Sequence, residues 1–319
     1  MKGDTNMRKL KISGYAYTLP KRTVEFDGCT RYRMSDDETL LDLAVKSCEN
    51  ALKKAEMTIN DIDCIVYAGA VGFQPIPCSA AILHEQIAKG TSIPATDICT
   101  TCTSFVSAMD IMSYLIDAGR YKNILIVSGD GASVGLNPEQ EESYKLFSDV
   151  STAFIISATE EDRGIIHSSQ YTFSEGAHDT EIRGGLNLLP PNTYSDERKA
   201  DYLFDMNGVQ ILRFCAKKLP ALFKNFINEI KELGYNGYES ITAVIPHQAS
   251  RALPMMMKKV GVPDGKYADR VDEYGNMVSA SIPFMLAKYL DEDLLKDSDT
   301  VMLCGTAAGL TCNFMLLKL

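Results

Sequence analysis

Short apolar strands alternate with amphipathic helices along the whole chain, and the order of elements in the first half returns in the second. Strand-like runs fall at residues 10–17, 63–68, 122–129 and 153–158, and again at 240–247 and 300–305. Helix-like runs fall at 79–88 and 105–116, at 208–233 with a break at Pro220, at 253–260 and after 276. This alternation predicts an α/β protein with a mainly parallel sheet.

The two halves can be aligned through one short match. Placing residues 127–129 on residues 303–305 carries Cys102 onto Val278, two positions from Asn276. Cys102 and Asn276 are therefore expected at equivalent strand-to-helix turns, beside a pseudo-twofold axis. No low-complexity linker separates the halves, so we expect one compact body with an N-terminal half, residues 1–165, and a C-terminal half, residues 166–319.

Cys102 stands where a segment of small hydroxyl residues meets the first turn of an apolar helix. Free N–H groups and the dipole at a helix N-terminus favour an anion, and this environment lowers a thiol pKa. Cys102 is therefore a candidate nucleophile that accepts an acyl group. The alternative is a structural cysteine in the core, since cysteine is among the most buried residue types.

Cys99 and Cys102 also form a C-x-x-C pair, which can indicate a thiol redox pair or half of a zinc site. The sequence holds no second C-x-x-C, and its histidines have no ligand spacing to this pair, so we expect no metal. Cys99 is expected in the core. A G-x-S-x-G match at residues 131–135 lies beyond its strand and precedes no apolar helix, so we interpret it as a glycine-rich loop.

Two polar residues in the second half are candidates for the same site. His247 directly follows an apolar strand, and catalytic groups gather at the carboxyl ends of strands in α/β sheets. Asn276 lies at a turn after Gly275. Taken singly, a hydrogen-bonded histidine and a turn asparagine need no catalytic role. Their interest comes from their relation to Cys102.

Composition restricts the setting in which such a site works. The chain has 319 residues, of which 45% are hydrophobic and 23% charged, and its net charge is −10. An acidic surface argues against non-specific nucleic-acid binding. Nine cysteines without a regular framework indicate a reducing compartment. We expect no signal peptide at residues 1–6, no membrane span and a cytoplasmic location.

With Cys102, His247 and Asn276 identified, the chain resembles β-ketoacyl-acyl-carrier-protein synthase III of the thiolase superfamily. The resemblance covers nearly the whole chain and is strongest at residues 97–102, 245–249, 275–283 and 306–311. It implies an α/β fold of duplicated, thiolase-like βαβ halves that form a layered α-β-α-β-α body. It also implies a homodimer.

The resemblance assigns a role to each candidate residue. Cys102 would take an acyl group from acyl-CoA as a thioester, while His247 and Asn276 would hold a malonyl thioester, promote loss of CO2 and stabilise the enolate. The backbone N–H groups of Cys102 and Ala308, with Gly309 beside it, would form the oxyanion hole. No cofactor is implied, because CoA and phosphopantetheine thioesters are the substrates. The product would be a β-ketoacyl thioester of fatty-acid or related specialised biosynthesis.

Binding residues can be carried over in the same way. The acyl tunnel is expected near Phe73, Ile76 and Pro77. Acyl carrier protein or CoA is expected to dock on basic residues, namely Arg31, Arg33, Arg213, Arg251, Lys258 and Lys259. The family's loop that grips the CoA nucleotide with a tryptophan and an arginine is compressed here to residues 25–33, and the sequence has no tryptophan.

Two other functions fit the same residues. A non-condensing acyltransferase to an oxygen or nitrogen nucleophile would keep Cys102 and His247 but would not need to decarboxylate its substrate, so the presence of Asn276 favours condensation. A non-catalytic subunit that binds an acylated carrier, or pairs with an active paralogue, is disfavoured by the retention of all three residues.

Overall fold

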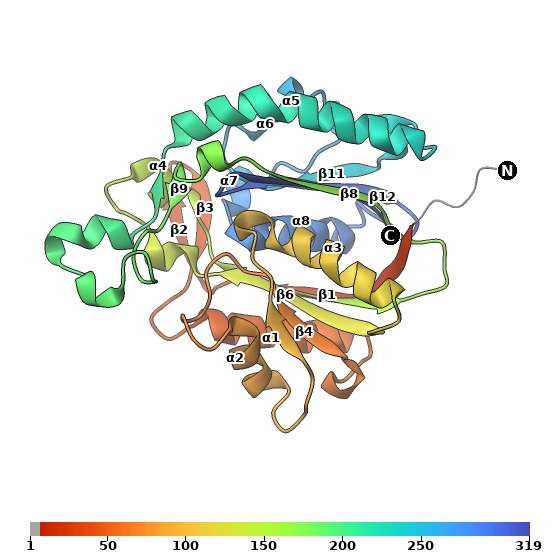
Figure 1. The fold of residues 1–319 in the computed structure, drawn as a ribbon, viewed down its shortest axis with the longest axis horizontal. Coiled ribbons are helices and arrows are strands. Elements are labelled where there is room, and N and C mark those ends of the chain that lie inside the picture. The colour runs from red at the N-terminus through yellow and green to blue at the C-terminus, as the bar shows by residue number, and fades with distance from the viewer. Residues whose placement is uncertain (1–6) are drawn as a thin grey trace.

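The computed structural model describes residues 7–319, and its elements stack in five layers (Figure 1). The outer helices are α1 (Leu40–Lys54) and α2 (Ser79–Ile87) on one side and α5 (Gly208–Glu232) and α6 (Leu253–Lys259) on the other. Two sheet layers lie inside them. Helices α3 (Ser104–Asp117) and α8 (Ser281–Asp291) fill the centre (Figure 1). The expected α-β-α-β-α body is confirmed.

The strands of both sheet layers form one hydrogen-bonded series in the order β11-β12-β13-β8-β1-β7-β6-β4-β5. Strands β1 and β8 join the two halves, through the pairing of Arg8 with Ile165 and of Lys9 with Gly164. The strand bounds are β1 (Arg8–Thr18), β4 (Cys64–Tyr67), β5 (Ala95–Asp97), β6 (Asn123–Asp130), β7 (Val150–Ala158), β8 (Gly164–Thr172), β11 (Ala243–Pro246), β12 (Thr300–Ala307) and β13 (Thr311–Lys318).

The expectation of a mainly parallel sheet is wrong. Pairing is parallel for β4–β5, β4–β6 and β11–β12, but β1, β7, β8 and β13 pair antiparallel with their neighbours. Strands β8 and β13 were not expected from the sequence. Strand β13 follows β12 across the turn at 308–310, which is too short for the crossover that a parallel pair needs.

Smaller elements gather at one end of the layers (Figure 1). They are the hairpin of β2 (Arg22–Phe26) and β3 (Cys29–Arg33), the pair β9 (Thr180–Glu181) and β10 (Asp205–Met206), and the helices α4 (Glu141–Leu146) and α7 (Val271–Tyr274). Short 3₁₀ turns are η1 (Ile59–Asp61), η2 (Thr101–Thr103), η3 (Ala132–Gly135), η4 (Ser174–Gly176), η5 (Pro191–Thr193), η6 (Asp196–Tyr202), η7 (Gly237–Ser240) and η8 (Val278–Ala280). Helix α5 continues through Pro220, where a break was expected.

Each helical layer has its own hydrophobic cluster, and the strands between layers contribute to two clusters at once. On β6, Ile124 and Ile126 belong to the central cluster, whereas Leu125 and Val127 belong to the cluster under α1 and α2. Strand β12 divides its side chains in the same way between the central cluster and the α5–α6 cluster. Burial on both faces explains why these strands are continuous apolar runs.

The sequence repeat is present, but its register differs by one residue from the expected one. Helices α3 and α8 begin 177 residues apart, as do strands β6 and β12. Thr101 and Val278 share a left-handed φ of 50° and 51° at the starts of η2 and η8. The equivalent of Cys102 is therefore Ser279 and not Val278. Because both faces of the aligned strands are apolar, a slip of one residue left the hydrophobic pattern unchanged.

Within residues 7–319, no helix has the length and apolar character needed to cross a membrane. The expectation about a signal peptide concerns residues 1–6, which lie outside the described residues.

Candidate active site

Cys102 lies in the η2 turn, between β5 and the first turn of α3. The preceding residue, Thr101, has a left-handed backbone that is rare for a β-branched residue, and its hydroxyl donates to the Ala308 carbonyl at 3.3 Å. The following residue, Thr103, is buried, and its hydroxyl accepts a hydrogen bond from the Asn313 amide at 2.9 Å. The turn is thus fixed on both sides of the cysteine by residues of the C-terminal half.

The Cys102 thiol is half-buried, and its pKa is raised to about 12 because burial penalises the thiolate and the nearby Asp130 carboxylate repels it. The backbone N–H groups of Ala308 and Cys102 favour the thiolate but do not outweigh these effects. The backbone N–H groups thus act in the expected direction, but the net pKa of the thiol is raised and not lowered. The resting residue is a thiol, with the Ala308 N–H within hydrogen-bonding reach of its sulfur.

His247 directly follows β11, and its side chain is almost completely buried. Its backbone N–H donates to the Cys304 carbonyl at 2.8 Å, which anchors the residue to β12. Burial lowers the pKa of the imidazole to about 4. Its Nδ1 is buried and has no hydrogen-bond partner among the described residues. The imidazole is therefore neutral near pH 7.

Asn276 follows Gly275 at the turn before η8, and it is also buried. Gly275 has a φ of 73°, and a Cβ there would lie 2.4 Å from the Leu146 carbonyl oxygen, so only glycine fits. The Asn276 Oδ1 accepts from the Val278 N–H at 2.8 Å, and its Nδ2 donates to the Ala249 carbonyl at 3.3 Å. These two bonds fix the amide, with its N–H donors on the side of the His247 loop.

The three residues lie on segments that contact one another. A Cβ on Gly305 would lie 2.9 Å from the Cβ of His247 and 3.1 Å from Cγ2 of Thr103, the neighbour of Cys102. The Asn276 amide reaches Ala249, two residues after His247. The η2 and η8 turns also contact one another. The structure thus gathers a thiol, a neutral imidazole, an amide and the Ala308 N–H in one region.

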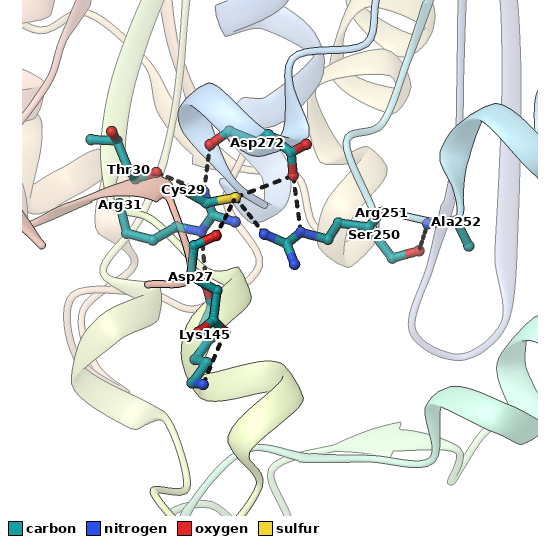
Figure 2. A network of polar contacts seen from close by, with 9 residues as sticks. All are labelled: Asp27, Cys29, Thr30, Arg31, Lys145, Ser250, Arg251, Ala252 and Asp272. Atoms are coloured by element: carbon teal, nitrogen blue, oxygen red, sulfur yellow. Dashed lines mark hydrogen bonds and ion pairs between the residues drawn. The ribbon is translucent and has the colours of Figure 1, made fainter. Parts of the chain in front are cut away.

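Arg31 and Arg33 do not face a binding surface. Arg31 is 1% exposed, and its guanidinium donates to the carbonyls of Lys145, Thr30 and Asp272 at 2.8, 2.6 and 3.1 Å (Figure 2). Arg33 is also buried, between the rings of Phe26 and Tyr144. The expectation that these two arginines grip a ligand disagrees with the structure, because both charges are used inside the protein.

The other four basic residues are exposed on one side of the C-terminal half. Arg213 lies on α5, Lys258 and Lys259 form the last turn of α6, and Arg251 precedes that helix. Arg251 Nε contacts Asp272 at 2.9 Å, and its Nη2 contacts the Cys29 sulfur (Figure 2).

The expected tunnel residues lie in the loop before α2. Phe73 packs against Tyr67 with ring centroids 4.9 Å apart and ring planes tilted by 53°. Ile76 is 83% exposed and precedes Pro77 through a cis peptide bond, so it lines no cavity of its own chain. Cys99, expected in the core, is also exposed, because β5 ends at Asp97 and the cysteine lies beyond the strand.

Two buried carboxylates were missed by the sequence analysis. Asp149 accepts from the backbone N–H and the hydroxyl of Ser133 at 2.8 and 2.6 Å, which gives the G-x-S-x-G serine a structural contact. Asp130 ends β6, and its charge raises the pKa of the Cys102 thiol. An acidic residue at the end of an otherwise apolar strand was the available signal for both the burial and the position of Asp130.

Comparison with known proteins supplies the family. Sequence profiles described as 3-Oxoacyl-[acyl-carrier-protein (ACP)] synthase III and its C terminal match residues 96–174 and 210–319. A Beta-ketoacyl-[acyl-carrier-protein] synthase III of Clostridium perfringens is 32% identical over 98% of this chain and 100% of its own. One of Staphylococcus aureus is 30% identical over 90% of this chain and 86% of its own.

Solved structures agree on the fold. The 3-oxoacyl-(acyl-carrier protein) synthase of Burkholderia xenovorans LB400 has a TM-score of 0.88 at 22% identity, covering 98% of this chain and 95% of its own. The 3-oxoacyl-[acyl-carrier-protein] synthase III of Aquifex aeolicus VF5 has a TM-score of 0.84 at 22% identity, covering 97% and 100%. By sequence and by fold, this chain belongs to the 3-oxoacyl-[acyl-carrier-protein] synthase III family.

Proposed function

We propose that this protein transfers an acyl group from an acyl thioester to Cys102 and condenses it with a malonyl thioester on an acyl carrier protein. The products are a β-ketoacyl thioester and CO2. The observation that carries this proposal is that the segments bearing Cys102, His247 and Asn276 contact one another, with the Ala308 N–H at the Cys102 sulfur. Membership of a family named for this synthase activity supports it.

In the acylation step, the Cys102 sulfur adds to the carbonyl carbon of the donor thioester. The N–H groups of Cys102 and Ala308 donate to the developing oxyanion, with Gly309 allowing the turn beside Ala308 a φ of 114°. The carbon–sulfur bond of the donor then breaks. Because the resting residue is a thiol, its proton leaves as the new bond forms and ends on the departing thiol.

In the condensation step, the malonyl thioester oxygen accepts hydrogen bonds from His247 Nε2–H and Asn276 Nδ2–H. Loss of CO2 leaves an enolate, and its carbon attacks the acyl group on Cys102. The bond to Cys102 then breaks, and the released thiolate takes a proton from water. A neutral imidazole suits this step, because burial keeps the pKa of His247 at about 4.

Four exposed cations supply a docking surface for an acidic carrier in this proposal: Arg213, Arg251, Lys258 and Lys259. Cys29 and Asp272 hold the Arg251 side chain, so the cation is preorganised (Figure 2). We also propose a homodimer formed through the sheet edge at β5, which pairs with β4 on one side.

The test is the intact mass of the protein after incubation with a panel of acyl-CoAs and acyl carriers. One added acyl mass is expected in the wild type and in Cys99→Ala, which removes the exposed neighbouring thiol, but not in Cys102→Ala. Malonyl carrier should discharge the adduct with release of CO2.

Each other result has a definite meaning. Acylation without discharge supports a non-condensing acyltransferase and contradicts the proposal. No acylation from any donor removes Cys102 as the nucleophile of the isolated chain and favours a binding subunit. Reversal of Lys258 and Lys259 to glutamate should raise the KM for the carrier, and an unchanged KM removes the docking surface.

A further inference from the structure

Asp130 is a buried charged residue that neither proposed chemical step uses. It is 2% exposed and ends β6. Its Oδ1 accepts from the N–H groups of Ala70 and Val71 at 2.9 and 2.8 Å. Its Oδ2 accepts from the N–H and the hydroxyl of Ser279 at 3.1 and 2.5 Å. Four donors around two oxygens match an ionised carboxylate.

The repeat gives this contact a meaning. Ser279 is the equivalent of Cys102, and Asp130 is the equivalent of Ala307 at the end of β12. The Cys102 turn therefore meets the end of β12 at Ala308, while the Ser279 turn meets the end of β6 at Asp130. In the first turn the Cys102 thiol meets the Ala308 N–H. In the equivalent turn the Ser279 hydroxyl donates to the Asp130 carboxylate.

The groups that bind the Asp130 carboxylate are close in the chain to residues of the candidate site. Ser279 lies in the η8 turn, where the Val278 N–H binds the Asn276 side chain. Ala70 and Val71 begin the loop that leads to Phe73. The titratable groups whose pKa the Asp130 carboxylate raises are the thiol of Cys102 and the phenol of Tyr67, whose hydroxyl donates to the Gly129 carbonyl at 2.6 Å. Cys99 is the other titratable group acting on Cys102.

We propose that Asp130 is a positioning residue whose carboxylate locks the Asn276 turn onto the end of β6 and the loop at Ala70, and whose negative charge adds to burial in disfavouring the Cys102 thiolate. This inference rests on the proposed function. The Asp130 carboxylate would then have two effects that can be measured separately. The hydrogen bonds to Ser279 serve condensation through Asn276, and the negative charge acts on the thiol.

Two variants separate these effects. Asp130→Asn keeps the size of the side chain but removes the charge and one acceptor. Ser279→Ala removes one hydrogen bond and leaves the charge. Alkylation of Cys102 by iodoacetamide, followed by intact mass between about pH 6 and pH 10, reports the thiol. Cys102→Ala identifies the adduct on Cys102. Acylation by acyl-CoA and discharge by malonyl carrier are timed separately.

Asp130→Asn should alkylate faster than the wild type, by about tenfold at pH 8 if the charge accounts for one pKa unit. Its discharge by malonyl carrier should be slower. Ser279→Ala should alkylate like the wild type and also discharge more slowly. A purely structural role would not accelerate one reaction while slowing the other.

Several results would overturn the inference. Asp130→Asn with a wild-type alkylation profile would remove the effect of the charge. Normal discharge in Ser279→Ala would remove the effect on the Asn276 turn, and this variant decides that point even when Asp130→Asn does not fold. If the wild type accepts no acyl group, the proposed function fails, whereas the alkylation comparison still measures what Asp130 does to the thiol.

Discussion

The charge state of His247 can be tested directly, because the surroundings of this imidazole strongly disfavour its protonation. The side chain is almost completely buried, its Nδ1 has no hydrogen-bond partner among the residues described, and burial lowers its pKa to about 4. A histidine in an unfolded chain titrates near 6.5. The folded protein should therefore keep His247 neutral under conditions in which the unfolded chain is protonated.

The size of the effect follows from the separation of these two pKa values. One unit corresponds to about 1.4 kcal/mol, so the full difference is about 3 kcal/mol. As the pH falls from 6.5 towards 4, the unfolded chain binds a proton and the folded protein does not. The free energy of unfolding therefore falls over this window, by about 2 kcal/mol at pH 5. His247→Gln has no imidazole at this position and should escape the loss.

Two assays measure the pKa of His247 and its effect on stability. In an NMR titration of the four histidines, the signal that is missing from His247→Gln should stay neutral to about pH 4. In urea unfolding, the wild type should lose more stability than His247→Gln between pH 7 and pH 5. The raised pKa of Asp130 acts in the opposite sense in both proteins and cancels in the comparison. Titration of His247 near pH 6.5, or equal losses in the two proteins, would refute the reasoning.

Three glycine and arginine substitutions test the supports of the site. Gly275→Ala should lower the free energy of unfolding by more than about 2 kcal/mol, because the new Cβ would lie 2.4 Å from the Leu146 carbonyl in a left-handed backbone; a wild-type urea midpoint would contradict this. Arg31→Met should cost about 3 kcal/mol in the same assay, since three part-buried hydrogen bonds from a buried guanidinium to carbonyls are lost; a loss below about 1 kcal/mol would mean that water replaces them. Gly305→Ala should slow discharge of the acyl-enzyme by about tenfold or more, because the new Cβ would lie 2.9 Å from the Cβ of His247 and displace it. Unchanged turnover would contradict this, since it would mean that other atoms move and His247 stays in place.

The layered fold was predictable because its strands are buried on both faces. Runs such as 122–129 have few ways to be accommodated other than between two helical layers. The same property made the pairing direction and the register unpredictable. An apolar run carries no mark of its partner, so the antiparallel β8 and β13 were missed and the repeat was aligned one residue early.

The residues of the candidate site were predictable from position and residue type, but their electrostatics were not. Cys102, His247 and Asn276 each stand at the end of an element, where a sequence pattern can find them. The Cys102 pKa depends on Asp130, and the burial of Arg31 depends on carbonyls of Lys145 and Asp272. Both properties arise from tertiary interactions between segments that are distant in the sequence, and no local sequence pattern encodes such interactions.

The central layer has a consequence for how the two halves of the chain evolve and fold. It holds one helix from each half, α3 and α8, and their side chains share a single hydrophobic cluster. Either half alone would expose the inner face of its sheet and the flank of its helix, so each half acts as the missing subunit of the other. Substitutions in this layer should therefore occur as compensated pairs across the duplication. Two halves made as separate chains should complement one another only when they are co-expressed.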